Sequence, residues 1–205
     1  MAKPKSQGRS QAYKLRRFET REVRKRFLLI CEGTKTEPNY FKEFRSNQTV
    51  VEAEGFAKDP RSLVDTAIEL RKQKRLKGQE FDEVWCVFDR DDVPPGKFNA
   101  ALSQAEANNI KVAYSNEAFE LWYVLHFEYL NAGIPRKDYQ AKIAKHLGLP
   151  SYKKNDPSLY ARLLDYRKDA IANAARLLES YPSPNPAQDN PSTTIHLLVE
   201  ALLGR

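Results

Sequence analysis

The sequence predicts an α/β fold built on a parallel sheet of about four strands, followed by a helical C-terminal extension. Two observations support this prediction. From residue 26 to residue 127, short apolar runs of strand length alternate with amphipathic stretches of helix length, which is typical of parallel sheets with right-handed crossovers. From residue 128 onward the patterns are helical. We therefore expect an α/β domain at residues 26–127 and a helical extension packed on it at residues 128–205.

Each strand is predicted from a short run of apolar residues bounded by turn-forming residues. The run at residues 26–31 is apolar almost throughout, as in a central strand that is buried on both faces. The other strands are expected at residues 49–53, 81–88 and 110–114. Cys31 and Cys86 both fall inside these strands, so we expect core thiols in a reducing cytoplasm and neither a disulfide nor a zinc site.

Helices are predicted from apolar periodicity and from capping signals. In the α/β part they are expected at residues 36–44, with Thr36 as the N-cap, at residues 62–77, which Ser62 opens and Gly78 ends, and at residues 98–108. In the rest of the chain they are expected at residues 117–127, 137–147, 158–180 and 195–203. The helix at 117–127 is apolar nearly all round, so it should be buried.

Carboxylates follow two of the predicted strands at the point where each strand ends. Glu32 and Gly33 come directly after the first strand, and Asp89 and Asp91 come directly after the third. The carboxyl ends of parallel strands are where ligands bind in such sheets. Strand residues alternate, so Asp89 and Asp91 should point to the same side. Oxygen ligands of this kind suit Mg²⁺ or Mn²⁺, and Glu32 could act as a general base or as a metal ligand. Gly33 would let the backbone turn sharply and approach a ligand closely.

Further candidate residues lie at the starts of two predicted helices. Asn116 and Glu120 are four residues apart and should share a helix face. Glu120 lies in an otherwise apolar helix, and a buried carboxylate needs a metal ion or a basic residue as its partner. Lys35 stands near the positive end of the first helix, where it could hold a phosphate. The alternative for Lys35 is an exposed lysine with no ligand.

The positive charge of the chain is concentrated at the N-terminus. Residues 1–26 contain ten Lys or Arg and two Glu, a net charge of +8, whereas the remaining 24 basic and 25 acidic residues give −1. We expect residues 1–25 to form a flexible basic arm, with Arg16, Arg17, Arg24 and Lys25 as phosphate contacts to nucleic acid. A solubilising tail is the alternative. A second basic cluster at residues 71–77 ends a predicted helix, where the helix dipole alone would favour it.

The sequence also indicates where the protein works. No apolar run approaches the roughly 20 residues needed to span a bilayer. The N-terminus is basic from the start and has no apolar signal region. We therefore expect a cytoplasmic protein without a membrane partner.

Four motifs follow one another at residues 31–41, 87–91, 115–122 and 190–194. In this order they resemble the RloB-like family of bacterial abortive-infection and defence proteins. More broadly, Glu-Gly after the first strand and Asp-x-Asp after the third resemble a TOPRIM domain, the Rossmannoid catalytic module of topoisomerases, primases and OLD-type nucleases. The family resemblance covers about residues 27–200. Glu117 departs from the family pattern, which often has Pro at this position.

The resemblance implies a TOPRIM-like fold and a nuclease of bacterial anti-phage defence, often encoded beside an ATPase. Carried over by motif, Glu32 would be the general acid/base, Asp89 and Asp91 would bind metal, and Glu120 would be an accessory ligand. No residue matches the nucleophilic tyrosine of topoisomerases, so covalent strand passage is not implied.

Three hypotheses about function follow. The first is a Mg²⁺- or Mn²⁺-dependent phosphodiesterase, a hydrolase of DNA or RNA, in which Glu32 or the metal ion activates water. The second is nucleotidyl or phosphoryl transfer to small nucleotides, which would not need residues 1–25. The third is a non-catalytic nucleic-acid-binding or sensor subunit of an ATPase-containing system, whose binding would survive in EDTA. The sequence leaves the oligomeric state open.

Overall fold

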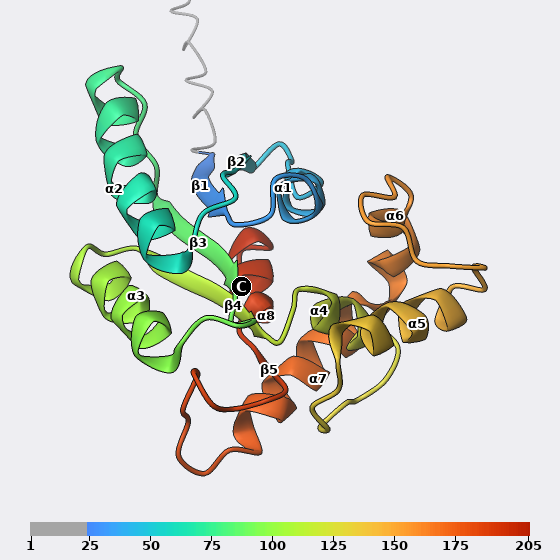
Figure 1. Cartoon of the computed structure of the whole chain (residues 1–205). Helices are drawn as coiled ribbons and strands as arrows, with labels where there is room; N and C mark the ends of the chain where they lie inside the picture. Colours follow the sequence, from blue (N-terminus) through green and yellow to red (C-terminus); the bar gives the residue numbers. More distant parts are fainter. Residues whose placement is uncertain (1–23) are drawn as a thin grey trace, which may run out of the picture.

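A computed structural model describes residues 24–205 and places a five-stranded sheet at the centre of the protein (Figure 1). The strand order is β2-β1-β3-β4-β5. The first four strands are parallel, as predicted, and the fifth is antiparallel to β4. The bounds are β1 Lys25–Cys31, β2 Thr49–Gly55, β3 Glu83–Asp89, β4 Lys111–Asn116 and β5 Ser192–Thr193.

Helices cover both faces of the sheet and give an α/β fold of three layers. The helices α2 and α3 lie on one face, and α1 and α8 pack on the other. The helices α4 to α7 extend this second layer beyond the sheet (Figure 1). The bounds are α1 Thr36–Lys42, α2 Pro60–Leu76, α3 Pro95–Ala107, α4 Glu120–Val124, α5 Arg136–His146, α6 Leu159–Leu163, α7 Arg167–Glu179 and α8 Ile195–Leu202, with a 3-10 turn at Leu164–Tyr166.

Strand β1 lies inside the sheet, between β2 and β3, and is buried on both faces. Leu28 and Ile30 pack in the cluster beneath α2 and α3, whereas Phe27, Leu29 and Cys31 pack in the cluster beneath α1 and α8. This alternation confirms the prediction of a central strand with two apolar faces. Both cysteines are free and buried in these clusters, as expected for core thiols.

The C-terminal part differs from its prediction in two ways. The helix expected at residues 158–180 is divided into α6, the 3-10 turn and α7. Residues 192–193, which were not predicted as a strand, extend the sheet as β5. The two residues are polar and too few to show periodicity. Instead, side-chain hydrogen bonds join β5 to β4: the Ser115 and Thr193 hydroxyls lie 2.9 Å apart, and the Thr194 hydroxyl accepts from the Tyr114 amide at 2.9 Å.

The residues expected to form a helical extension share their core with the sheet. Buried residues of α5, α7 and α8 belong to the same hydrophobic cluster as Phe27 and Leu29 of β1. The region 128–205 is therefore packed on the α/β part without a separate core. Among residues 24–205, none of the helices combines the length and the apolar character that crossing a bilayer requires.

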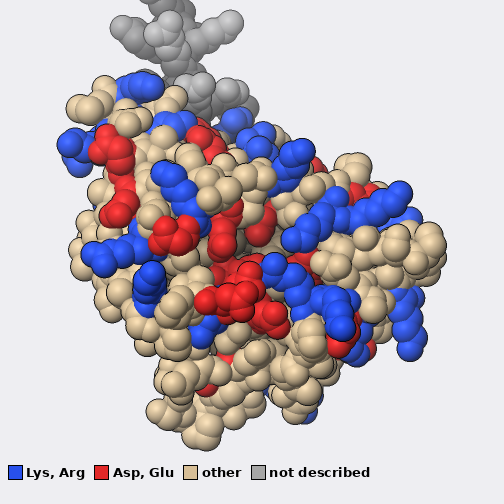
Figure 2. Space-filling model, in the orientation of Figure 1, with Lys and Arg blue, Asp and Glu red and all other residues tan. Residues whose placement is uncertain are grey.

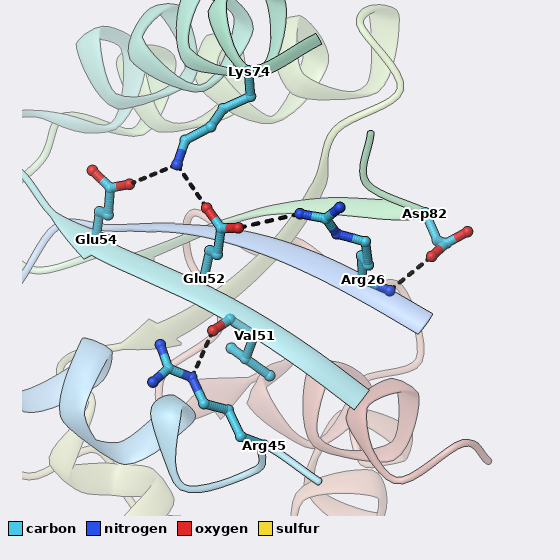
Figure 3. A network of polar contacts seen from close by, with 7 residues as sticks. All are labelled: Arg26, Arg45, Val51, Glu52, Glu54, Lys74 and Asp82. Atoms are coloured by element: carbon cyan, nitrogen blue, oxygen red, sulfur yellow. Dashed lines mark hydrogen bonds and ion pairs between the residues drawn. The ribbon is translucent and has the colours of Figure 1, made fainter. Parts of the chain in front are cut away.

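Ion pairs fasten the edge strand β2 to its neighbours (Figure 3). The Glu52 carboxylate accepts from Lys74 of α2 at 2.6 Å and from Arg26 of β1 at 3.3 Å, and Glu54 lies 3.7 Å from the same lysine. The hydrogen bond to Glu52 raises the pKa of Lys74. Lys74, a member of the basic cluster at residues 71–77, thus has a structural role that needs no nucleic acid.

Candidate active site

The ends of β1 and β3 bring Glu32 and Asp89 together. The two strands run parallel, with Cys31 opposite Val87. The Glu32 amide continues this ladder by donating to the Val87 carbonyl at 2.8 Å, and the Glu32 carboxylate accepts from the Asp89 amide at 3.0 Å. The register of the sheet therefore fixes how far apart the two acidic residues lie.

Asp91 reaches the same region by a different route from the one predicted. Strand β3 ends at Asp89, and Asp91 lies in a turn with a φ of 37°, so the argument from strand alternation is wrong. The two aspartates are joined by Arg136 at the start of α5. Its guanidinium donates to Asp91 at 2.9 Å and lies 3.5 Å from Asp89. Nothing in the sequence around Arg136 indicated this contact, because the arginine is 45 residues or more from either aspartate.

Glu37 is a site residue that the sequence reasoning missed. It lies in the first turn of α1 and is only 9% exposed. One oxygen of its carboxylate is buried without a hydrogen-bond partner among the described residues. The helical spacing in the sequence could have identified Glu37, because it places Glu37 on the same side as the buried Tyr40, Phe41 and Phe44. Such an acid on an apolar face marks a functional candidate.

Gly33 leaves space for the Glu37 carboxylate in its present position. A Cβ atom at Gly33 would collide with the Glu37 carboxylate. The φ of Gly33 is not in the left-handed region, where Gly78, Gly148 and Gly204 lie. Glycine at this position therefore allows close packing against the Glu37 carboxylate, and the predicted reason, a sharp turn, does not apply.

Glu120 is buried, as predicted, and its partner is a basic residue. It is 2% exposed, and its Oε1 atom lies 3.6 Å from the Lys154 ammonium, too far for a hydrogen bond. The expectation that Asn116 and Glu120 share a helix face is wrong. Asn116 is the last residue of β4, and its side-chain amide donates to the Asp189 carbonyl at 2.7 Å. Helix α4 begins only at Glu120.

Glu37, Asp89 and Glu120 line a cavity of about 250 Å³, here called the acidic cavity. We use the name acidic site for Glu32, Glu37, Asp89, Asp91 and Glu120 together. Figure 2 shows acidic side chains gathered near the middle of one face of the protein, with Lys and Arg side chains on both sides. The residues lining the acidic cavity are Gly33, Thr34, Lys35, Thr36, Glu37, Asp89, Phe119, Glu120, Lys154 and Asn155.

Burial and repulsion by neighbouring carboxylates disfavour the ionised forms of Glu32, Glu37 and Asp89. Burial is the main reason that the pKa of Asp89 lies well above its ordinary value of 3.8, and the nearby Glu37, Glu32 and Glu120 raise it further. Burial also raises the pKa of Glu32 and of Glu37. Arg136 opposes the shift at Asp89, and Lys154 opposes it at Glu37. Two cations thus compensate part of the negative charge.

The carboxylate oxygens of the acidic site are ligands of the type that a hard divalent cation prefers. The site offers only carboxylate oxygens, and buried oxygens of Glu37 and Glu120 lack hydrogen-bond partners. Within residues 24–205, however, no three His, Cys, Asp or Glu side chains lie close enough together to ligate one ion. Arg136 is ion-paired with Asp89 and Asp91, and Lys154 is ion-paired with Glu120. The metal-ligand roles of Glu32, Asp89, Asp91 and Glu120 therefore stay predictions.

The predicted phosphate-binding residues fall into three groups. Lys35 is exposed and lines the acidic cavity. Lys25 was expected in the arm, but it begins β1, at the opposite end of the strand from Glu32, and pairs with Glu83 at 2.6 Å. The strand β1, which begins with Lys25 and ends just before Glu32, separates the two residues by roughly 20 Å. Arg24 is exposed just before β1, and Arg16 and Arg17 lie outside the described residues.

Comparison with known proteins identifies one family. A family model described as RloB-like protein matches residues 27–202, which is most of the chain and includes every residue of the acidic site. Neither the curated proteins nor the solved structures contain a significant match.

The raised pKa of Asp89 predicts how stability depends on pH. Protonation of Asp89 in the folded state contributes stability that is fully present below about pH 4 and is lost as the pH rises through the folded-state pKa. The Asp89→Asn variant lacks this loss. Between pH 4 and neutrality, the free energy of unfolding of Asp89→Asn should therefore rise relative to that of the wild type, by at most about 1.4 kcal/mol per pH unit.

Urea unfolding in EDTA at several pH values measures this difference. Asp65→Asn on the exposed surface of α2 is the control for loss of one carboxylate. A difference between Asp89→Asn and the wild type that stays constant with pH would contradict the prediction.

Proposed function

The chain belongs to the RloB-like family, and we propose that it is a metal-dependent phosphodiesterase of TOPRIM type that cleaves DNA or RNA in bacterial anti-phage defence. One observation carries the proposal. Buried carboxylate oxygens of Glu37 and Glu120 lack hydrogen-bond partners among the described residues, and both residues line the acidic cavity beside Asp89. Buried carboxylate oxygens without a hydrogen bond in such an acidic environment are costly unless a cation is bound.

The residues that would hold Mg²⁺ or Mn²⁺ are Asp89, Asp91 and Glu120, which the sequence predicted, together with Glu37. When bound, the ion would supply positive charge that polarises the scissile phosphate and stabilises the leaving oxygen. Burial, and after it repulsion by neighbouring carboxylates, raises the pKa of Asp89 and of Glu37, and a divalent cation would relieve this repulsion and favour the ionised forms.

Glu32 is the residue best suited to proton transfer. Burial raises its pKa, which brings the group closer to neutral pH, where a general base or acid works best. The hydrogen bond from the Asp89 amide holds its carboxylate in one orientation beside the cavity. Glu32 would therefore take a proton from the attacking water and pass it to the leaving oxygen.

Basic residues around the acidic site would hold the negatively charged substrate. Lys35 and Lys154 line the acidic cavity and would contact the phosphate that is cleaved. Arg24, and Arg16 and Arg17 from the basic N-terminal segment, would contact phosphates farther along the strand. We further propose a cytoplasmic location, where phage nucleic acid is accessible, and an ATPase as a partner that controls cleavage.

A cleavage assay tests the proposal with matched isosteric variants. Purified protein is incubated with plasmid DNA, single-stranded DNA and tRNA in Mg²⁺, Mn²⁺ or EDTA. Glu32→Gln should lower the rate by about a hundredfold or more, because it removes the proton acceptor but keeps the shape. Glu106→Gln, an exposed change on α3, should leave the rate unaltered. Equal metal-dependent cutting by Glu32→Gln and wild type would overturn the role of Glu32.

The position of Arg136 leads to a prediction about the affinity of the acidic site for Mn²⁺. Its guanidinium bridges Asp89 and Asp91, so an ion bound there has to displace it. The variant Arg136→Gln should therefore bind Mn²⁺ more tightly than the wild type. At saturating Mn²⁺ this gives about 1.4 kcal/mol of extra stabilisation against unfolding for each tenfold gain in affinity.

The midpoint of urea unfolding at increasing Mn²⁺ concentration measures this stabilisation without reference to activity. Arg61→Gln, at an exposed position on α2, controls for the loss of one positive charge. If Arg136→Gln and the wild type respond equally to Mn²⁺, the two aspartates do not hold the ion.

A further inference from the structure

A second cavity adjoins the acidic cavity and shares part of its wall. It has a volume of about 170 Å³ and is here called the tyrosine cavity. Thr36 and Asn155 line both cavities. The Thr36 hydroxyl donates to the Asn155 side-chain carbonyl at 3.0 Å, so one hydrogen bond forms the partition between them. Because the two cavities are so close, one ligand such as a nucleotide unit could place one of its parts in each of them.

Three tyrosine rings line the tyrosine cavity and are held rigidly. Tyr40 and Tyr123 are buried, and Tyr160 is half-buried. The Tyr40 hydroxyl accepts from the Trp122 indole at 2.9 Å, and the Tyr160 hydroxyl accepts from Arg167 at 2.6 Å. Two of the three hydroxyls are thus engaged elsewhere in the protein. Tyr40 packs edge-to-face against Tyr123 and Tyr160, so the ring that a ligand meets is mainly that of the half-buried Tyr160, which suits a flat apolar group.

The polar groups of the tyrosine cavity suit a neutral ligand with a hydrogen-bonding edge. Asn39 and Asn155 carry amides, which both donate and accept. Lys42 adds one ammonium group, and Glu43 and Asp156 add two carboxylates that accept hydrogen bonds, so the charged groups of the lining are negative in sum and disfavour a phosphate. Asp156 keeps its charge readily, because hydrogen bonds from Ser158 lower its pKa. A flat ring bearing amino groups meets these requirements, and a second phosphate does not.

We propose that the tyrosine cavity binds one unstacked nucleobase of a single strand whose phosphate lies at the acidic site. The inference rests on the proposed function and names its substrate class. The cavity is smaller than pockets that enclose drug-sized ligands. Aromatic rings with a few amide groups are how proteins hold bases that have left a stack. Single strands and loops are therefore the substrates, because a duplex keeps its bases stacked and paired.

Binding measured in EDTA tests the inference separately from cleavage. The probe is a short fluorescent single-stranded oligonucleotide, as DNA and as RNA, and a set of copies with one abasic position each. Tyr160→Leu should weaken binding of the intact strand by about tenfold, because it removes a stacking ring. Tyr160→Phe keeps the ring and should bind like the wild type. Tyr166→Leu, at a residue 45% exposed outside the cavity, is the matched control.

A second variant keeps the test valid if Tyr160→Leu folds poorly. Asn155 has a φ of 67°, which glycine adopts readily, so Asn155→Gly removes the amide without backbone strain. It should weaken binding of the intact strand severalfold. It should leave unchanged the binding of the strand that lacks the base proposed to enter the tyrosine cavity. For the wild type, one abasic position should matter more than the others, and neither duplex nor free mononucleotide should compete as well as the single strand.

Three results would overturn the inference: equal binding by Tyr160→Leu and Tyr160→Phe, equal effects of all abasic positions, or competition by free mononucleotide as strong as by the single strand. The last would assign the cavity to a small nucleotide. Failure of the proposed function gives a different result. Base-dependent binding would remain, while Mg²⁺ or Mn²⁺ would produce no cleavage in the wild type.

Discussion

Repulsion among five carboxylates at one edge of the sheet is the constraint on which this structure depends. Glu32, Glu37, Asp89, Asp91 and Glu120 come from different segments, and burial disfavours the charged forms of Glu32, Glu37 and Asp89. Within residues 24–205, Arg136 and Lys154 are the cations that ion-pair with this group. The fold therefore holds together groups that would separate if the backbone allowed it, and such a site gains stability when it binds positive charge.

The backbone resists this repulsion through close packing. Glu32 is fixed at both ends, because its amide and its carboxylate are hydrogen-bonded to β3. The turn after β1 passes so near to Gly55 that a Cβ atom there would collide with the Gly33 carbonyl and with Thr34. Two glycines thus allow β1, the end of β2 and the start of α1 to approach one another. That approach puts Glu37 beside the strand ends.

The sequence was sufficient for the elements with strong apolar patterns and for the acidic residues that directly follow them. Strand β1 and the order of alternating strands and helices were predicted because burial on two faces leaves a continuous apolar run. The contact between Glu32 and Asp89 followed from parallel pairing. Strand β5 could not be predicted, since its two residues are polar and are fixed by hydroxyl contacts to β4. Arg136 and Lys154 reach the site from segments distant in the sequence, and only the tertiary fold shows it.

The central claim is that the acidic site holds a divalent cation beside Glu32, and a Mn²⁺-soaked crystal tests it most directly. Anomalous scattering from manganese locates the ion without any assumption about activity. The account predicts a peak in contact with Asp89 and at least one of Glu37, Asp91 and Glu120, with the Arg136 guanidinium moved away from Asp91. Manganese bound only at other sites, with Arg136 still on the two aspartates, would contradict it.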